Sequence, residues 1–354
     1  MKKSLAILLA LTLPLSLAAC SSSGGGYGTQ TEVDDPYAHL ETYELSFSMH
    51  APAESTIGKC YQDMFDEISE KTHGHLNITV FGGATLAAAS DVASMVETGG
   101  CDMGWMFSSF YPGQFPLTDV IALPMMGQTT CERGTQVLWD IRENYPEMEA
   151  EWDRFHIVNM YANPTNTPYT TKIEPTDINA FKGLTMRTAD GGAAACIGGW
   201  GVNAIQMPPN EIYESLEKNN IQGFTFEPTG IIDYSLQEVT GYKLDMGIFQ
   251  ATFCTVMNKE SYEGLPDAFR EILDEYSTRE QSIKFAKAWD AYVKECDQML
   301  VDAGGTIITP TDEQYAEYKV SADAYVKNWI KERSANGFDA QEYYDFVVAA
   351  YEKY

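Results

Sequence analysis

Runs of alternating and of helically spaced apolar residues follow one another in a regular order along the first part of the chain. Ile57, Tyr61 and Phe65 recur at helical spacing in a helix that Gly74 can end, and Ser90 can cap a second helical segment. Strand-like alternation precedes, separates and follows these helices, at 43–48, 76–80 and 102–107. The order strand, helix, strand, helix, strand predicts a mostly parallel sheet covered by helices.

The same order of elements returns after residue 155. Between its strands lie a Gly/Ala-rich helix at 191–200 and a helix that Asn210 caps. The strand-like runs are 155–161, 183–188, 202–207 and 221–226. The repetition predicts two α/β units, and two such units with a crevice between them are typical of proteins that bind a small molecule.

A long helical pattern follows the two units. It begins at Pro266, which suits a first helical position, continues through Phe269, Trp289 and Leu300, and stops at Gly304. More than about 30 residues at about 1.5 Å each predict a helix of roughly 50 Å, which is long enough to lie across both lobes. Two further helices are expected at 311–334 and 340–353.

The N-terminus has the order of a bacterial export signal. A basic start is followed by an apolar run from Leu5 to Leu17 that is shorter than the about 20 residues of a membrane span. Leu17-Ala18-Ala19-Cys20 then forms a small-residue cleavage site, which predicts a signal peptide at 1–19. It resembles the lipobox, in which the cysteine thiol is acylated, for example with palmitate. The alternative is an ordinary cleavage near Ala19 with an incidental cysteine.

The segment 20–43 is predicted to be a lipid anchor and a flexible linker. It opens with an uninterrupted Ser/Gly run, and a random coil of this length spans about 25 Å. We therefore expect the protein in the periplasm or at the cell surface, held to a membrane by the lipid on Cys20.

Composition narrows the range of partners. The formal net charge is −28 and becomes −30 once the signal peptide is removed, which argues against nucleic acid and against adsorption to anionic lipid. A local cationic pocket for a small anion remains compatible with this charge. The 335 residues after the signal are long for one core and suit two lobes.

The cysteine and histidine spacing indicates neither a metal site nor a cofactor. The six cysteines after Cys20 include no CxxC pair, so a disulfide connectivity cannot be read, and buried free thiols are the alternative. There is no G-x-S-x-G motif. We expect a protein that is not an enzyme, against the alternative of an exported esterase.

One motif is more specific than the pattern around it. Residues 181–188, Phe-Lys-Gly-Leu-Thr-Met-Arg-Thr, resemble the "lysine-glycine-leucine-x-x-arginine" signature of the DctP-like family, the substrate-binding proteins of tripartite ATP-independent periplasmic (TRAP) transporters. Residues 201–208 and 210–216 resemble the strand and the tyrosine-containing helix that follow this signature. The resemblance covers roughly residues 44–335, with further matches at 81–104, 123–124, 256–259, 265–266 and 304–306.

The resemblance implies a two-lobed, periplasmic-binding-protein-like α/β fold of type II, with a long helix spanning both lobes. We expect lobe I at 44–165 and 254–296, and lobe II at 166–253 and 297–354. The implied function is that of a monomeric extracytoplasmic receptor that delivers an organic acid to TRAP permease subunits. The alternative is a lipoprotein receptor of the same plan that serves an ATP-driven importer.

Arg187 occupies the signature position, where the family's arginine forms a two-pronged salt bridge with the ligand's carboxylate. From the residues alone, a pair with an acid such as Asp190 is the alternative. Two departures bear on the ligand: 163–169 lacks the second arginine of many family members, and 222–228 reads Gln-Gly-Phe-Thr-Phe-Glu-Pro in place of "aspartate-glycine-x-glutamate-asparagine-proline". One cation and several aromatic residues favour a monocarboxylate with an apolar or aromatic body over a dicarboxylate or sialic acid.

Further ligand contacts are expected where strands end at the crevice. His50 and Glu54 follow the first strand, although Glu54 is better explained by the start of a helix. For each aromatic candidate, packing in the core is an equal alternative. Besides Arg187, the expected ligand-binding residues are Trp105, Phe107, Ser108, Tyr111, Asn166, Phe226 and Glu227.

Overall fold

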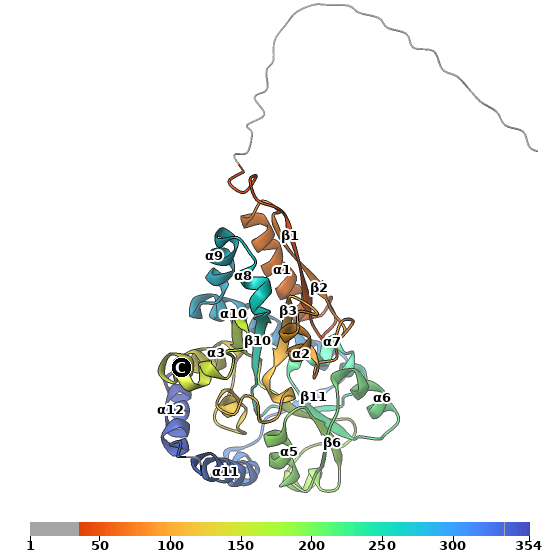
Figure 1. Ribbon diagram of the computed structural model, residues 1–354. Coiled ribbons are helices and arrows are strands. Elements are labelled where there is room, and N and C mark those ends of the chain that lie inside the picture. The colour runs from red at the N-terminus through yellow and green to blue at the C-terminus, as the bar shows by residue number, and fades with distance from the viewer. Residues whose placement is uncertain (1–34, 336) are drawn as a thin grey trace, which may run out of the picture. The chain divides into compact units, whose positions relative to one another are not determined.

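The computed structural model describes residues 35–335 and 337–354 (Figure 1). The predicted signal peptide, the lipid on Cys20 and the linker up to residue 34 lie outside these residues. Tyr37–Tyr354 form one compact unit, and its strands form two separate sheets, one at the centre of each lobe. This is the mixed α/β, two-lobed plan that the sequence predicts.

The first sheet has the strand order β2-β1-β3-β10-β4. β1 pairs in parallel with β2 and β3, whereas β10, which returns from the second lobe, is antiparallel to β3 and β4. All five residues of β3 are buried, because helices and loops cover both faces of the sheet there. The strands are β1 Tyr43–Ser48, β2 Leu76–Phe81, β3 Met103–Phe107, β4 His156–Ala162 and β10 Thr252–Met257.

The second sheet has the order β11-β9-β5-β8-β6-β7. β6 is parallel to β7 and β8, while β5, which enters directly from the first lobe, is antiparallel to β8 and β9. Each sheet is therefore mixed because one strand arrives by a direct crossing between the lobes. The strands are β5 Thr167–Thr170, β6 Thr185–Thr188, β7 Asn203–Gln206, β8 Gly223–Phe226, β9 Tyr242–Leu244 and β11 Thr306–Ile308.

Helices cover both sheets. In α1 (Thr56–Lys71) the hydroxyl of Ser55 accepts the backbone N–H of Gly58, and Ile57, Tyr61 and Phe65 are buried. The remaining helices are α2 Val92–Glu97, α3 Cys131–Asn144, α4 Pro146–Ala150, α5 Gly191–Gly198, α6 Ile212–Glu217, α7 Pro228–Asp233, α8 Lys259–Glu263, α9 Asp267–Tyr276, α10 Arg279–Asp302, α11 Asp312–Ser334 and α12 Ala340–Lys353.

Two crossings between the lobes lie side by side and bond to each other. The backbone N–H of Asn166 donates to the carbonyl of Phe249 (2.9 Å), and the N–H of Ile248 donates back to Asn166 (2.8 Å). The N–H of Asn163 donates to Ala251 (3.1 Å). Paired backbone of this kind joins the lobes at a defined position and leaves only a short segment to bend.

The prediction of one unbroken helix from Pro266 to Gly304 is wrong, because the segment forms α9 and α10. Thr278 adopts an extended backbone and its hydroxyl accepts the N–H of Gln281, so a new helix begins there. The hydroxyl of Ser277 donates to the carbonyl of Val158 (3.1 Å) and fixes the break against β4.

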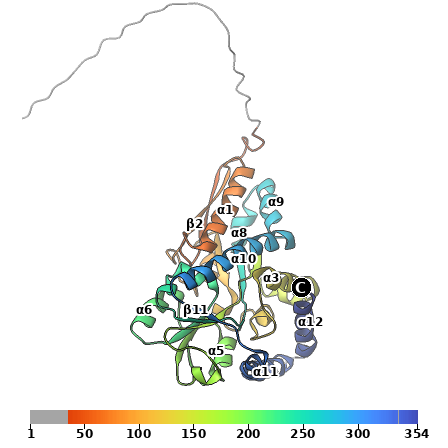
Figure 2. The ribbon, with the colours of Figure 1, turned by 180° about the vertical axis from the view of Figure 1, so that it is seen from behind.

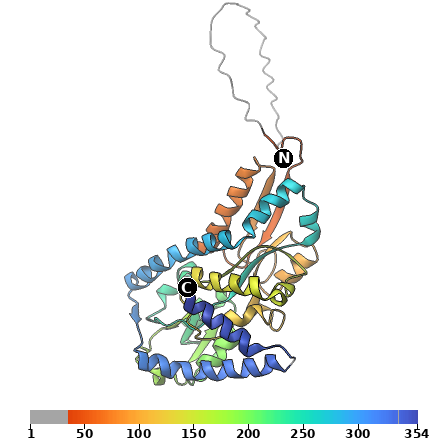
Figure 3. The same cartoon turned by 90° about the vertical axis from the view of Figure 1, so that its left-hand side faces the viewer.

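A long helix that spans both lobes is nevertheless confirmed. α10 has 24 residues, about 36 Å, and packs on α3 and β4 in the first lobe and on α7 and β11 in the second (Figures 2 and 3). Near its start Phe285 is buried with the aromatic residues of the first lobe, and near its end Leu300 is buried in the core of the second. The helix therefore acts as a strut between the two cores.

Two predicted helix caps are wrong. α2 begins after Asp91 rather than Ser90, and the hydroxyl of Ser90 donates to the carboxylate of Asp91 instead (3.3 Å). Asn210 lies inside a short 3-10 turn, Pro209–Glu211, and α6 begins after it. The predicted helices at 311–334 and 340–353 are confirmed as α11, with a Thr311–Gln314 capping box, and α12.

The C-terminal helix α12 packs against α3 beside the first sheet, and the exact division of the chain between the lobes stays a prediction. The six cysteines after Cys20 are buried and free. None of the helices within residues 35–335 and 337–354 has the length and apolar character of a membrane span.

Candidate functional site

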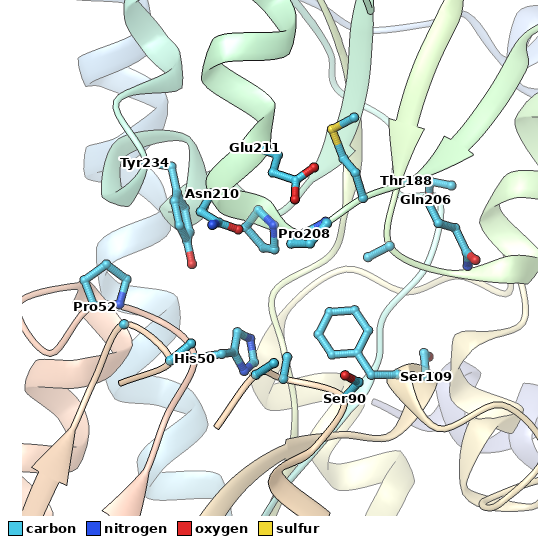
Figure 4. Close-up of a pocket in the computed structure, with 18 of the residues that line it drawn as sticks. His50, Pro52, Ser90, Ser109, Thr188, Gln206, Pro208, Asn210, Glu211 and Tyr234 are labelled. Atoms are coloured by element: carbon cyan, nitrogen blue, oxygen red, sulfur yellow. The ribbon is translucent and has the colours of Figure 1, made fainter. Parts of the chain in front are cut away.

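Two adjoining cavities lie between the lobes. The outer cavity has a volume of about 530 Å³. His50, Ser90 and Ser109 of the first lobe face Thr188 and Asn210 of the second across it (Figure 4). The inner chamber, of about 50 Å³, shares five lining residues with the outer cavity: His50, Phe110, Ala189, Pro209 and Tyr234. Only a ligand too large for the inner chamber would extend into the outer cavity.

Arg187 is the cation of the inner chamber. It stands on β6 with its side chain fully buried, where Nε donates to the carbonyl of Met207 (2.9 Å) and Nη1 to that of Thr225 (3.1 Å). Nη2 has no hydrogen-bond partner. Burial lowers the pKa of Arg187 to about 10, so the guanidinium is still charged at neutral pH. One edge of the fork is fixed by backbone carbonyls, and the other is free to bind an anion.

No acid of the described chain forms a salt bridge with Arg187. Asp190, the partner considered from the sequence, caps α5 by accepting the backbone N–H of Ala193 (2.9 Å). The ring of Phe226 lies under the guanidinium, 5.1 Å from its central carbon. Gly230 leaves room for this ring, since a Cβ at that position would lie 2.6 Å from it. Aromatic packing therefore helps to hold the guanidinium in place, and no carboxylate of the described chain pairs with its free edge.

The first lobe contributes a wall of stacked aromatic rings. Trp105 lies between His50 (4.4 Å between ring centres, 16°) and Phe253 (4.5 Å, 17°), and Phe107 stacks on Phe253 (5.0 Å, 18°). These rings come from β3, β10 and the loop after β1, which are neighbours in the first sheet. Their flat faces suit an apolar or aromatic ligand body.

A chain of hydrogen bonds behind this wall fixes its orientation. The indole N–H of Trp105 donates to the hydroxyl of Tyr161 (2.8 Å), which bonds to Tyr61 (2.7 Å), and Tyr61 bonds to Thr255 (2.7 Å). All four side chains are buried. The wall is therefore preformed.

Four further titratable groups line the inner chamber: His50, Glu227, Asp233 and Tyr234. Burial lowers the pKa of His50 to about 4, so its imidazole is neutral at pH 7, and its Nδ1 has no hydrogen-bond partner. Burial raises the pKa of Glu227 to about 8. The carboxylate of Asp233 accepts the backbone N–H (3.0 Å) and hydroxyl (3.1 Å) of Thr56, and so ties α7 to the start of α1 in the other lobe.

The structure brings five of the predicted ligand-binding residues together in the inner chamber: Arg187, Trp105, Phe107, Phe226 and Glu227. The other three line neither cavity. Ser108 donates to Asp119 (2.6 Å), Tyr111 donates to the carbonyl of Ala89 (2.7 Å), and Asn166 lies in the paired crossing.

Several lining residues were not predicted from the sequence. Phe253 and Trp289 line the inner chamber from β10 and α10, and the indole N–H of Trp289 donates to Thr229 in the second lobe (2.9 Å). The sequence signal for Phe253 was the apolar run of β10, which was not recognised as a strand. Among the described residues, no group of three or more His, Cys, Asp or Glu side chains could hold a metal ion.

Comparison with known proteins agrees with this architecture. The fold matches a marine metagenome TRAP solute-binding protein specific for aromatic acid ligands, in complex with metahydroxyphenylacetate (TM-score 0.83, 20% identity, 88% of this chain and 99% of that one). It matches equally a TRAP solute-binding protein of Rhodoferax ferrireducens with copurified benzoate (TM-score 0.83, 21% identity, 88% and 98%).

A sequence relative and a family model also match most of the chain. The outer membrane transporter protein TsaT of Comamonas testosteroni is 20% identical over 308 residues, which are 85% of this chain and 89% of that protein. The model of the bacterial extracellular solute-binding proteins of family 7, DctP, matches residues 47–332. That family consists of solute receptors and not of enzymes. The chain therefore belongs to the DctP family of extracellular solute-binding proteins.

Proposed function

We propose that this protein is the solute receptor of a TRAP transporter and that it binds a monocarboxylate with an aromatic or apolar body. The observation that carries the proposal is the free Nη2 edge of the buried Arg187, opposite the stacked rings of Trp105 and Phe253. A carboxylate would complete the guanidinium fork, and a ring would lie along the aromatic wall. The aromatic acids bound by two proteins of the same fold support this ligand class.

A single positive charge favours one carboxylate over two. Among the described residues that line the two cavities, Arg187 is the only lysine or arginine. A second carboxylate would be buried without a cation, which is unfavourable in a desolvated site. A dicarboxylate therefore fits less well than benzoate.

We further propose that the receptor delivers its ligand to TRAP permease subunits as a monomer tethered by the lipid on Cys20. A tether would raise the local concentration of the receptor at the permease. Mass spectrometry of the N-terminal peptide tests the lipid, and an unmodified Cys20 would contradict it. Light scattering in solution tests whether the receptor is a monomer.

A thermal-shift screen of organic acids, followed by calorimetry, tests the ligand class. Benzoate, 3-hydroxybenzoate and mandelate should raise the melting temperature, while C4-dicarboxylates and sugar acids should not. If only the dicarboxylates or sugar acids raise it, the assignment of a monocarboxylate with an aromatic or apolar body is wrong. Detectable turnover of a bound acid would contradict the assignment as a receptor.

A further inference from the structure

Glu227 has a different setting from the other acids near the cleft. It follows β8 at the start of α7, but its carboxyl group does not cap that helix. Within the described chain no other residue donates a hydrogen bond to this carboxyl group, and the only backbone N–H that helps it ionise is its own. Asp233, by contrast, accepts two hydrogen bonds from Thr56, and Asp190 accepts one from Ala193. Those two acids have partners that stabilise a negative charge, whereas Glu227 depends on its own backbone N–H and on the charge of Arg187.

The charged and titratable groups that face Glu227 come from every element around it. Arg187 on β6 is the one positive charge among them, and it favours the ionised carboxylate. Asp233 opposes ionisation, as a like charge on the same helix. The remaining groups are neutral at pH 7: Tyr234 after α7, Tyr169 on β5, Cys296 on α10 and His50 after β1. Burial outweighs the attraction of Arg187 and raises the pKa of Glu227 to about 8.

A bound carboxylate changes this balance in one direction. It pairs with the positive charge of Arg187 and places a second negative charge in the same buried chamber. Two carboxylates that share one site cannot both stay ionised without a large penalty. A protonated Glu227, in contrast, has an O–H group that can donate to the bound carboxylate.

We propose that Glu227 enters the ligand complex as a neutral carboxylic acid, so that binding one carboxylate at Arg187 fixes one proton on Glu227. The proposal rests on the proposed function and makes Glu227 a specificity-determining residue of the same site. The proton comes from the solvent onto a carboxylate oxygen of Glu227, and Arg187 keeps its own. The site would therefore hold Arg187 and the ligand as a neutral pair, with Glu227 as an added hydrogen-bond donor.

The direction of the pH dependence follows from linkage. Below about pH 7 Glu227 is protonated in the free and in the bound receptor, so affinity does not change with pH. Above about pH 8 the free receptor has an ionised Glu227 and the complex a protonated one, so binding takes up a proton. Affinity then falls with rising pH, by up to about tenfold per pH unit.

Calorimetry between pH 6 and pH 9.5 tests this proposal, in paired buffers of different ionisation enthalpy. The probe is the monocarboxylate that gives the largest shift in the screen above, by our expectation benzoate. Proton uptake per bound acid should be close to zero at pH 6 and approach one near pH 9. Glu227→Gln should bind within a few-fold of the natural protein at pH 6 and show no fall in affinity up to pH 9.

Glu54→Gln is the matched control, because Glu54 is exposed and lines neither cavity. Its affinity should fall with pH as in the natural protein. The proposal is overturned if the natural protein takes up no proton at pH 9, a result that needs no variant to fold, or if Glu227→Gln keeps the pH-dependent fall. Binding at pH 6 without proton uptake at pH 9 would leave the proposed function intact. If no monocarboxylate binds at pH 6, the proposed function fails and this inference with it.

Discussion

Each lobe forms one wall of the inner chamber. The two walls differ in how far their polar atoms have hydrogen-bond partners. In the first wall, Nδ1 of His50 has no hydrogen-bond partner, but this imidazole is neutral at pH 7. Behind the wall, Trp105 bonds to Tyr161, which bonds in turn to Tyr61. In the second wall, Nη2 of Arg187 has no partner, and no other described residue donates to the carboxyl group of Glu227.

This difference gives the two walls different roles in ligand recognition. The first wall offers a shape that exists before the ligand arrives, so contacts with it require little reordering. The second wall holds a buried charge that becomes fully compensated only when an anion binds. We therefore expect mutations in the first wall to change the stability of the protein, and mutations in the second to change ligand affinity.

Trp105→Ala should have the largest effect on the first wall. It removes a buried ring between His50 and Phe253 and the donor to Tyr161, and should lower the free energy of unfolding by about 3–5 kcal/mol. Trp105→Phe keeps a ring but loses the N–H, and should cost about 1–3 kcal/mol. Urea unfolding measures both. A loss under about 1 kcal/mol for the alanine variant would show that the wall is not tightly packed.

Arg187→Met should have the largest effect on the second wall. Methionine has no charge to pair with a carboxylate, so benzoate affinity should fall by about 100-fold or more, which corresponds to about 3 kcal/mol. The melting temperature should fall less than in Trp105→Ala, because the substitution removes two hydrogen bonds to backbone carbonyls but breaks no buried ion pair. Arg187→Lys keeps the charge without the fork. Its benzoate affinity, measured by calorimetry, should lie between those of the natural protein and Arg187→Met. An unfolded Arg187→Met protein would give this arginine a structural role instead.

His50→Gln should have the smallest effect, and only in acid. The pKa of His50 falls from 6.5 to about 4 on folding, so the unfolded chain binds more protons between these values. The stability that the neutral imidazole contributes is present above about pH 6.5 and is lost as the pH falls toward 4.

Melting temperatures at pH 7, 5 and 4 measure this effect. The glutamine variant should lose less stability between pH 7 and pH 4 than the natural protein does. His39→Gln, at an exposed histidine, is the control and should follow the natural protein. Equal acid sensitivity of all three proteins would show that His50 does not stay neutral in the fold.

The local sequence pattern was sufficient to predict the elements that carry Arg187 and its neighbours in the chamber. The signature at 181–188 places this arginine on β6, and Phe226 and Glu227 follow from their position at the end of β8. The same reasoning was insufficient for Ser108 and Tyr111. They follow β3, but the chain turns there into a 3-10 helix, Ser108–Phe110, and their hydroxyl groups bond within the first lobe.

Residues brought in from distant segments could not be found by local pattern. Phe253 reaches the chamber because β10 inserts between β3 and β4, and that pairing depends on the crossings between the lobes. Trp289 reaches it because α10 lies across both cores. The break at Thr278 did have a local signal, since the Thr-x-x-Gln spacing of Thr278 and Gln281 is typical of a helix start.

Calorimetry with benzoate and with its neutral analogue benzamide, at pH 6, tests the central claim most directly. The two have the same ring and nearly the same shape, so they differ in whether they can neutralise Arg187. We predict that the natural protein binds benzoate about 100-fold more tightly than benzamide, and that Arg187→Met binds both equally weakly. Equal affinity of the natural protein for benzoate and benzamide, or unchanged benzoate binding by Arg187→Met, would contradict the account.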